Sequence, residues 1–214
     1  MGLRKHFDEE LNEIRSDVLR MGSLVSEMAR AAVDATLQGE LEHATKVMQM
    51  DDEVDRLEQE LMTKCVLVVM KEAPVASDLK TLASILSVVG ELEKGGDDMV
   101  KLARRATKLT GHFPGEMKLA LREMGEAVGK EFASAVKLIS EYDDELADRV
   151  IKADKQIDGQ YVSARDRLIA IIQENPTATE HLVRSIEAFH ALEHLADHAV
   201  EIAKRLKVHF GRAS

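Results

Sequence analysis

The chain contains the same long stretch twice, and this internal duplication limits its possible folds more than any other feature. When Glu93 is aligned with Glu193, Asp97 falls on Asp197. The same alignment pairs Leu92 with Leu192, Val100 with Val200, Leu102 with Ile202 and Ala103 with Ala203. Upstream, after a small change of offset, Val47, Asp51, Val54 and Asp55 fall on Val150, Asp154, Ile157 and Asp158. The fold must therefore be built from two copies of one unit.

Six long helical segments are expected, three in each copy. They cover about residues 5–38, 42–72, 77–109, 116–141, 144–174 and 177–210. Gly39, Pro74 and Pro176 separate segments, and residues 110–115 form a break halfway along the chain. We expect Ser77 or Asp78 to cap the third helix and Thr177 or Thr179 to cap the sixth.

The short connections predict antiparallel neighbouring helices and an all-α fold. The expected architecture is two tandem repeated three-helix bundles, the first over residues 1–110 and the second over 116–214. Composition agrees: aromatic residues make up only 3% of the chain, tryptophan is absent and there are three prolines. β-Sandwiches favour aromatic residues and frequent turns, so this composition excludes them.

Charge and cysteine content exclude several classes of protein. The net charge of −10 argues against nucleic-acid binding, which needs clustered Lys and Arg. The single cysteine, Cys65, rules out an internal disulfide and is expected to be a buried, inert thiol. Residues 1–10 lack an apolar signal segment, and the longest apolar run, residues 65–70, is too short to span a bilayer. We therefore expect a cytoplasmic protein that reaches the membrane only through partners.

Four pairs of carboxylates interrupt the apolar stripes of the predicted helices. The pairs are Asp51/Asp55, Glu93/Asp97, Asp154/Asp158 and Glu193/Asp197. Residues four apart lie on the same helix face, so each pair brings two like charges together. Near a core such charges need compensation. Because the pairs are duplicated, we favour metal sites or polar clusters, with buried salt bridges to Lys or Arg as the alternative.

His190, His194 and His198 follow at intervals of four residues and resemble a metal-binding face. The first copy has Gly90, Lys94 and Asp98 at these positions, so the histidines are not duplicated. A solvated row of histidines is the favoured interpretation, although His198 adjoins a predicted ligand and could join the outer sphere of a metal.

No arrangement of residues predicts catalysis. The chain has no Gly-x-Ser-x-Gly motif, and Gly95-Gly96 lacks the Lys-Ser/Thr that a phosphate-binding loop requires. Close helix packing, or a local distortion that orients the carboxylates, explains the two glycines better.

Over essentially its whole length the chain resembles the PhoU family of phosphate-transport accessory proteins. The motif on each third helix carries the resemblance: residues 93–98 read Glu-Lys-Gly-Gly-Asp-Asp and residues 193–198 read Glu-His-Leu-Ala-Asp-His. The usual family form is Glu-Arg-Ile-Gly-Asp, often followed by His in the second copy. Gly96 and Asp197-His198 match this form, whereas Gly95 replaces an apolar residue and Ala196 replaces a glycine.

The resemblance implies a regulator without enzymatic activity. The eight paired carboxylates would hold one multinuclear metal cluster per bundle, of iron, zinc, manganese or magnesium. The protein would restrain phosphate uptake and the phosphate-starvation response by contacting the transporter ATPase subunit and a membrane sensor histidine kinase, and it would form a homodimer.

Two alternatives remain open at this point. A ferritin-like di-iron carboxylate protein needs two Glu-x-x-His motifs, and Glu40/His43 and Glu187/His190 have that spacing. Neither motif is duplicated, which argues against this class. The other alternative is a PhoU-like accessory protein of a different phosphate transporter.

Overall fold

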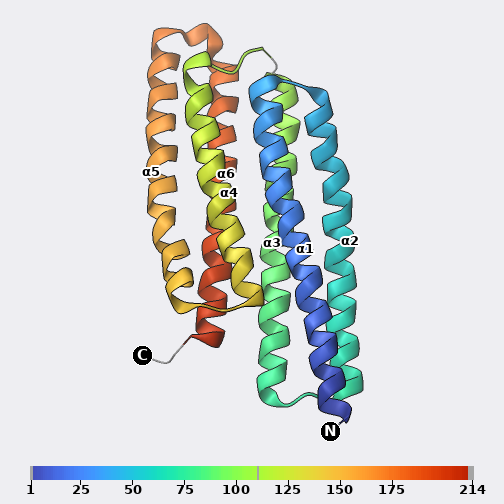
Figure 1. The fold of residues 1–214 in the computed structure, drawn as a ribbon. Helices are drawn as coiled ribbons and strands as arrows, with labels where there is room; N and C mark the ends of the chain where they lie inside the picture. Colours follow the sequence, from blue (N-terminus) through green and yellow to red (C-terminus); the bar gives the residue numbers. More distant parts are fainter. Residues whose placement is uncertain (1, 110, 212–214) are drawn as a thin grey trace.

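The computed structural model describes residues 2–109 and 111–211. Six long helices occupy most of this length (Figure 1): α1 Gly2–Gln38, α2 Leu41–Glu72, α3 Ala76–Leu109, α4 Lys118–Ser140, α5 Asp144–Glu174 and α6 Thr179–Phe210. Two single 3₁₀ turns, Gly115–Met117 and Pro176–Ala178, precede α4 and α6. The predicted all-α fold of six long helices is confirmed.

The helices end where the sequence makes continuation unfavourable. Gly39 follows α1 with φ of 73°, a left-handed conformation that glycine adopts without strain. Ala73 ends α2 with φ of 45°, just before Pro74. Asp143 caps α5, because its side chain accepts a 2.6 Å hydrogen bond from the backbone N–H of Leu146.

The expected caps of α3 and α6 are wrong. Helix α3 already begins at Ala76, so Ser77 and Asp78 lie in its first turn. Helix α6 begins at Thr179 after a 3₁₀ turn that contains Thr177, and its N-cap position is Ala178.

The two sets of three helices lie side by side along their length (Figure 1). Helix α3 packs against α6 and α1 packs against α4, each pair antiparallel. One continuous cluster of buried side chains runs through both sets, so the halves share a hydrophobic core. Within the described residues, no helix has an apolar stretch of the length and hydrophobicity that a bilayer span requires.

The contact between α1 and α4 is reciprocal. A Cβ atom added to Gly22 would lie 2.6 Å from Cγ1 of Val136, and one added to Gly125 would lie 2.9 Å from Cγ2 of Val33. Gly22 and Gly125 hold equivalent positions in the two halves, as do Val33 and Val136. Each half therefore supplies both a glycine and the valine that fills the space beside the other half's glycine.

Candidate functional site

In the first half, α2 and α3 bring together the four predicted carboxylates Asp51, Asp55, Glu93 and Asp97. Asp51 and Glu93 are half-buried, whereas Asp55 and Asp97 are exposed. Burial, together with the charges of Asp55 and Asp97, raises the pKa of Asp51 to about 6. The pKa of Glu93 is also raised, by burial and then by Asp97 and Glu58. The cluster therefore carries more negative charge than its surroundings compensate.

In the second half, α5 and α6 bring together the corresponding four carboxylates. Asp154, Asp158 and Glu193 are half-buried and Asp197 is exposed. Burial raises the pKa of Asp154, and the charges of Asp158 and Asp197 raise it further. Burial and Asp197 raise the pKa of Glu193 in the same way. The duplication in sequence is thus a duplication in space.

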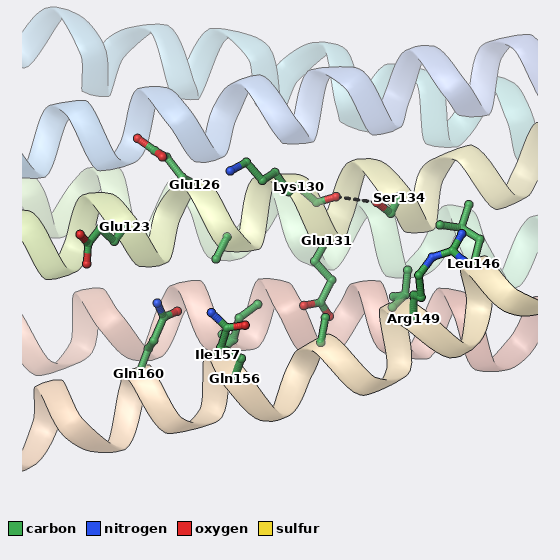
Figure 2. Close-up of a pocket in the computed structure, with 13 residues that line it drawn as sticks. Glu123, Glu126, Lys130, Glu131, Ser134, Leu146, Arg149, Gln156, Ile157 and Gln160 are labelled. Atoms are coloured by element: carbon green, nitrogen blue, oxygen red, sulfur yellow. Dashed lines mark hydrogen bonds between the residues drawn. The ribbon is translucent and has the colours of Figure 1, made fainter.

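The second cluster contains a fifth carboxylate, Glu131, which was not predicted. Glu131 lies on α4 and is only 5% exposed. Burial raises its pKa to about 8, with contributions from Asp154, Asp158 and Asp197. Neither of its carboxylate oxygens has a hydrogen-bond partner. Figure 2 shows the side chain turned from α4 toward α5, beside a groove of about 630 Å³ between these helices.

The first half has no equivalent of Glu131, because Met28 holds that position. A Cβ atom added to Gly96 would lie 3.6 Å from Cε of Met28 and 3.5 Å from Oδ1 of Asp51, so the methionine borders the first cluster. A signal for Glu131 was present in the sequence. It stands three residues after Val128 and four before Ala135, on the buried stripe of its helix.

Direct ion pairs do not compensate these charges. Among the described side chains, those of residues 6–109 and 111–211, no Lys or Arg nitrogen lies within 4.0 Å of any of the eight predicted carboxylates. Arg104 and Lys204 act from farther away. Their charges oppose the rise in the pKa of Asp51 and of Asp154 respectively, but do not cancel it. Oδ1 of Asp154 and Oε2 of Glu193 are buried without hydrogen-bond partners. The salt-bridge alternative is therefore not supported.

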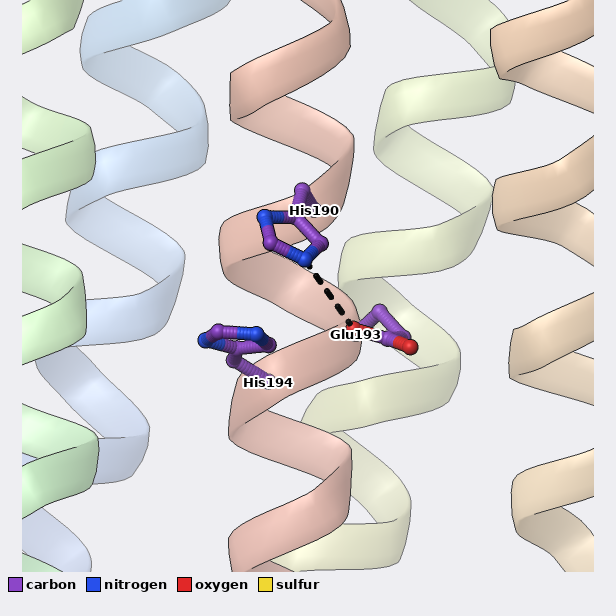
Figure 3. Close-up of side chains that lie close together, drawn as sticks. All are labelled: His190, Glu193 and His194. Carbon is purple, nitrogen blue, oxygen red and sulfur yellow. Dashed lines mark ion pairs between the residues drawn. The ribbon is translucent and has the colours of Figure 1, made fainter.

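The closest set of potential metal ligands combines Glu193 of the second cluster with two histidines of α6. In the part of the chain that the structure describes, only His190, Glu193 and His194 place three ligand atoms within 4.8 Å of one another (Figure 3). The carboxylate oxygens of the two clusters are farther apart. A cation bound there would have to draw them together by side-chain rotation.

The expectation of a solvated histidine row is wrong for His198. Its ring is 17% exposed and lies between two acids of α3: Nδ1 is 2.8 Å from Oε2 of Glu91, and Nε2 is 3.5 Å from Oδ2 of Asp98. Arg205 also reaches Glu91, at 3.2 Å from Oε1. His198 therefore belongs to a polar network across the seam between the two halves. His190 and His194 are exposed.

The two glycines of the first motif have different surroundings. A Cβ atom on Gly95 would lie 2.9 Å from Cδ1 of Leu195, so the absence of a side chain lets α3 approach α6 closely. At Gly96 the nearest atoms are 3.5 Å away, which is ordinary contact. The second half has Ala196 at the latter position. Both departures from the usual motif thus concern helix packing and leave the carboxylates in place.

The motifs of the ferritin-like alternative do not form a di-iron core. Glu187 is paired with Arg105 on α3, at 3.1 Å. Glu40 is the N-cap residue of α2 and lies 3.5 Å from the His43 of its own motif. The two motifs lie on helices of different halves.

Comparison with known proteins agrees with this architecture. Residues 18–106 and 121–206 each match the PhoU domain. The chain is 33% identical over 204 residues to a phosphate-specific transport system accessory protein PhoU homolog of Pseudomonas aeruginosa, covering 94% of this chain and 84% of that protein.

Two crystal structures superpose closely on the model. PhoU from Pseudomonas aeruginosa matches with a TM-score of 0.90 and 32% identity, covering 95% of this chain and 98% of that one. The phosphate transport system regulatory protein PhoU from Streptococcus pneumoniae matches with a TM-score of 0.85 and 25% identity, covering 97% and 99%. The duplicated bundle, its mirrored acid motifs and the match of both halves to one domain place the chain in the PhoU family.

Proposed function

We propose that this protein is a regulatory accessory protein of phosphate-specific transport. The observation that carries the proposal is the match of both halves to the PhoU domain, together with 33% identity to an accessory protein of that system over 94% of the chain. It would act in the cytoplasm as a homodimer, without enzymatic activity. By contacting the transporter ATPase subunit and a membrane sensor histidine kinase, it would restrain both phosphate uptake and the starvation response.

Deletion of the gene tests this role. In phosphate-rich medium, the deletion strain should take up phosphate and produce alkaline phosphatase without restraint, and the wild-type gene should restore repression. If both outputs stay repressible by phosphate in the deletion strain, the proposal is wrong. If uptake alone is released, the protein serves a phosphate transporter that is not linked to the starvation response.

We further propose that the carboxylate clusters bind metal ions. Asp51, Asp55, Glu93 and Asp97 would hold one cluster, and Asp154, Asp158, Glu193 and Asp197 the other, of iron, zinc, manganese or magnesium. Both clusters lack a nearby Lys or Arg partner, and the second also contains buried carboxylate oxygens without hydrogen-bond partners; both observations support a cationic ligand. Glu131 would add a fifth carboxylate to the second site. A bound cation would neutralise the acids and tie α2 to α3 and α5 to α6, which stiffens a surface that partners contact.

Elemental analysis of purified protein tests metal binding. The variant with Glu93→Gln and Asp97→Asn should lose the metal of the first site, and the variant with Asp154→Asn and Asp158→Asn that of the second. A matched control carries Glu123→Gln and Glu126→Gln, which removes two exposed acids of α4. Equal metal content in all four proteins would refute the clusters and leave the family assignment intact.

A further inference from the structure

One turn of α6 carries a ligand set of a second type, which shares Glu193 with the second carboxylate cluster. His190, Glu193 and His194 each offer a ligand atom, and the three atoms lie within 4.8 Å of one another. The two imidazole rings are 4.2 Å apart between centroids. Figure 3 shows both rings and the carboxylate on the same side of the helix. This group needs little rearrangement to meet at one ion.

The donor atoms determine which ions suit this group. Two histidines four residues apart on one helix face are a known arrangement for zinc. Two imidazoles and one carboxylate, with water in the fourth position, complete a tetrahedral zinc site. Imidazole nitrogen favours zinc, copper and nickel, whereas clusters of carboxylates alone favour magnesium, calcium and manganese.

The carboxylate of Glu193 has an unsatisfied acceptor atom. Its Oε2 atom is buried and has no hydrogen-bond partner. Nε2 of His190 lies 3.9 Å from this oxygen, which is too far for a hydrogen bond. In Figure 3 one carboxylate oxygen is turned toward His190 and the other away from both rings. A buried acceptor in this state costs free energy unless an ion or a proton satisfies it.

A carboxylate also lies beside one of the two histidines. Nδ1 of His194 lies 3.6 Å from Oδ2 of Asp98 on α3. Histidines that bind metal through one nitrogen commonly donate the other N–H to a carboxylate, which fixes the ring orientation. Asp98 lies just beyond hydrogen-bond distance of His194, so a small movement of either side chain would let it accept this bond.

We propose that His190, Glu193 and His194 form a binding site for a divalent transition metal of the zinc and copper type. The first half has Gly90 and Lys94 at the two histidine positions, so each chain carries one such site. The site shares Glu193 with the second carboxylate cluster, but the proposal does not depend on the first cluster binding metal or on the role in phosphate transport. It makes the two halves of the chain chemically unequal.

Copper is a suitable probe, because nitrogen ligands split its electron paramagnetic resonance spectrum. One equivalent of Cu²⁺ added to the full-length wild-type protein should give nitrogen hyperfine structure. Calorimetric titration with Zn²⁺ should give one site that the variant with His190→Gln and His194→Gln lacks. We expect the affinity to fall at least about tenfold, the loss seen even when outer-sphere partners are removed.

Two controls separate this site from other binding. The variant with His6→Gln and His43→Gln also loses two histidines, but these stand near the starts of two antiparallel helices and cannot share an ion. The variant with Glu93→Gln and Asp97→Asn removes the first carboxylate cluster alone. Both should keep the copper spectrum and the zinc affinity. The proposal is overturned if copper at one equivalent shows oxygen ligands only, or if the variant without His190 and His194 keeps the nitrogen signal.

Discussion

Asp98 and His198 hold equivalent positions in the two halves of the chain, and their side chains meet across the seam between α3 and α6, with Nε2 of the histidine 3.5 Å from Oδ2 of the aspartate. At this one position of the duplicated helix, α3 therefore carries an acid and α6 carries a histidine that is positively charged when protonated. Burial would raise the pKa of Asp98, but His198 and Lys101 lower it to about 2. Burial would lower the pKa of His198, but Asp98 and Glu91 raise it.

Replacing His198 with Gln should destabilise the protein by about 2–3 kcal/mol at pH 6, because the charged hydrogen bond to Glu91 and the ion pair with Asp98 are lost. Because the pKa of His198 is raised on folding, protonated His198 stabilises the wild-type protein. The stabilisation is complete at pH values below 6.5, the pKa in the unfolded chain, and disappears as the pH rises through the pKa in the folded protein. Because the pKa of Asp98 is lowered, its ionised form stabilises the folded protein at pH values above 3.8, the pKa in the unfolded chain. This stabilisation is lost as the pH falls toward the folded-state pKa of about 2. Urea unfolding between pH 3 and 9 checks this, with His43→Gln, a half-buried histidine outside this network, as the control. Equal loss of stability at pH 6 and pH 9 would contradict it.

Replacing Glu131 with Met, the residue of the other half, should stabilise the metal-free protein. The pKa of about 8 means that folded protein holds a proton that the unfolded chain releases near 4.5, so wild-type stability falls as pH rises between these values. The free energy of unfolding of the wild type therefore falls by about 1.4 kcal/mol per pH unit in this range. Unfolding in a chelator at pH 5 and pH 8 should show a larger gain at pH 8. Glu126→Met, at an exposed site on the same helix, should show no such difference.

Replacing Gly22 with Ala should destabilise the protein, although alanine is the better helix former. The new Cβ would meet both γ-carbons of Val136 at 2.6 Å, and valine has little freedom to turn away. Overpacking costs about 1–3 kcal/mol, which the gain of about 1 kcal/mol in helix propensity offsets only in part. Gly159→Ala on α5 is the matched control, since nothing lies within 4 Å and it should stabilise. Adding Val136→Ala to the Gly22 variant should recover stability. Unfolding curves that show equal gains for both glycine variants would refute the close approach.

Cys65 should react slowly with thiol reagents in the native protein. Its side chain is 1% exposed, and burial raises the pKa of the thiol to about 11. The thiolate, which is the reactive form, is therefore scarce. Labelling should become fast in denaturant, and a cysteine placed at exposed Thr63 should label quickly in the native state. Rapid labelling of native Cys65 would show that this part of α2 opens.

The helices could be predicted because their evidence is local. Apolar periodicity and breakers such as Gly39 and Pro74 act within a few residues, and the duplication then requires two matching bundles. The acid pairs could be found for the same reason. Which of these acids are half-buried and which are exposed could not be predicted, since it depends on how far each helix is rotated in its bundle.

Contacts between side chains on different helices could not be predicted from the sequence. Glu131 stood on a visible apolar stripe, but only the packing of α4 on α5 shows which acids it joins. His198 adjoins a predicted ligand in sequence, yet the register of α3 against α6 turns it toward Glu91 and Asp98. The spacing of His190 and His194 showed a shared face, whereas the approach of Glu193 depends on its side-chain conformation.

The reciprocal glycine–valine contacts imply an origin by fusion. A polypeptide of half this length, with one glycine and one valine on its first helix, would close the same seam with an identical molecule by two-fold symmetry. Joining two such subunits end to end released each from the need to complement itself. Differences such as Met28 against Glu131 could then accumulate on one side without being forced on the other.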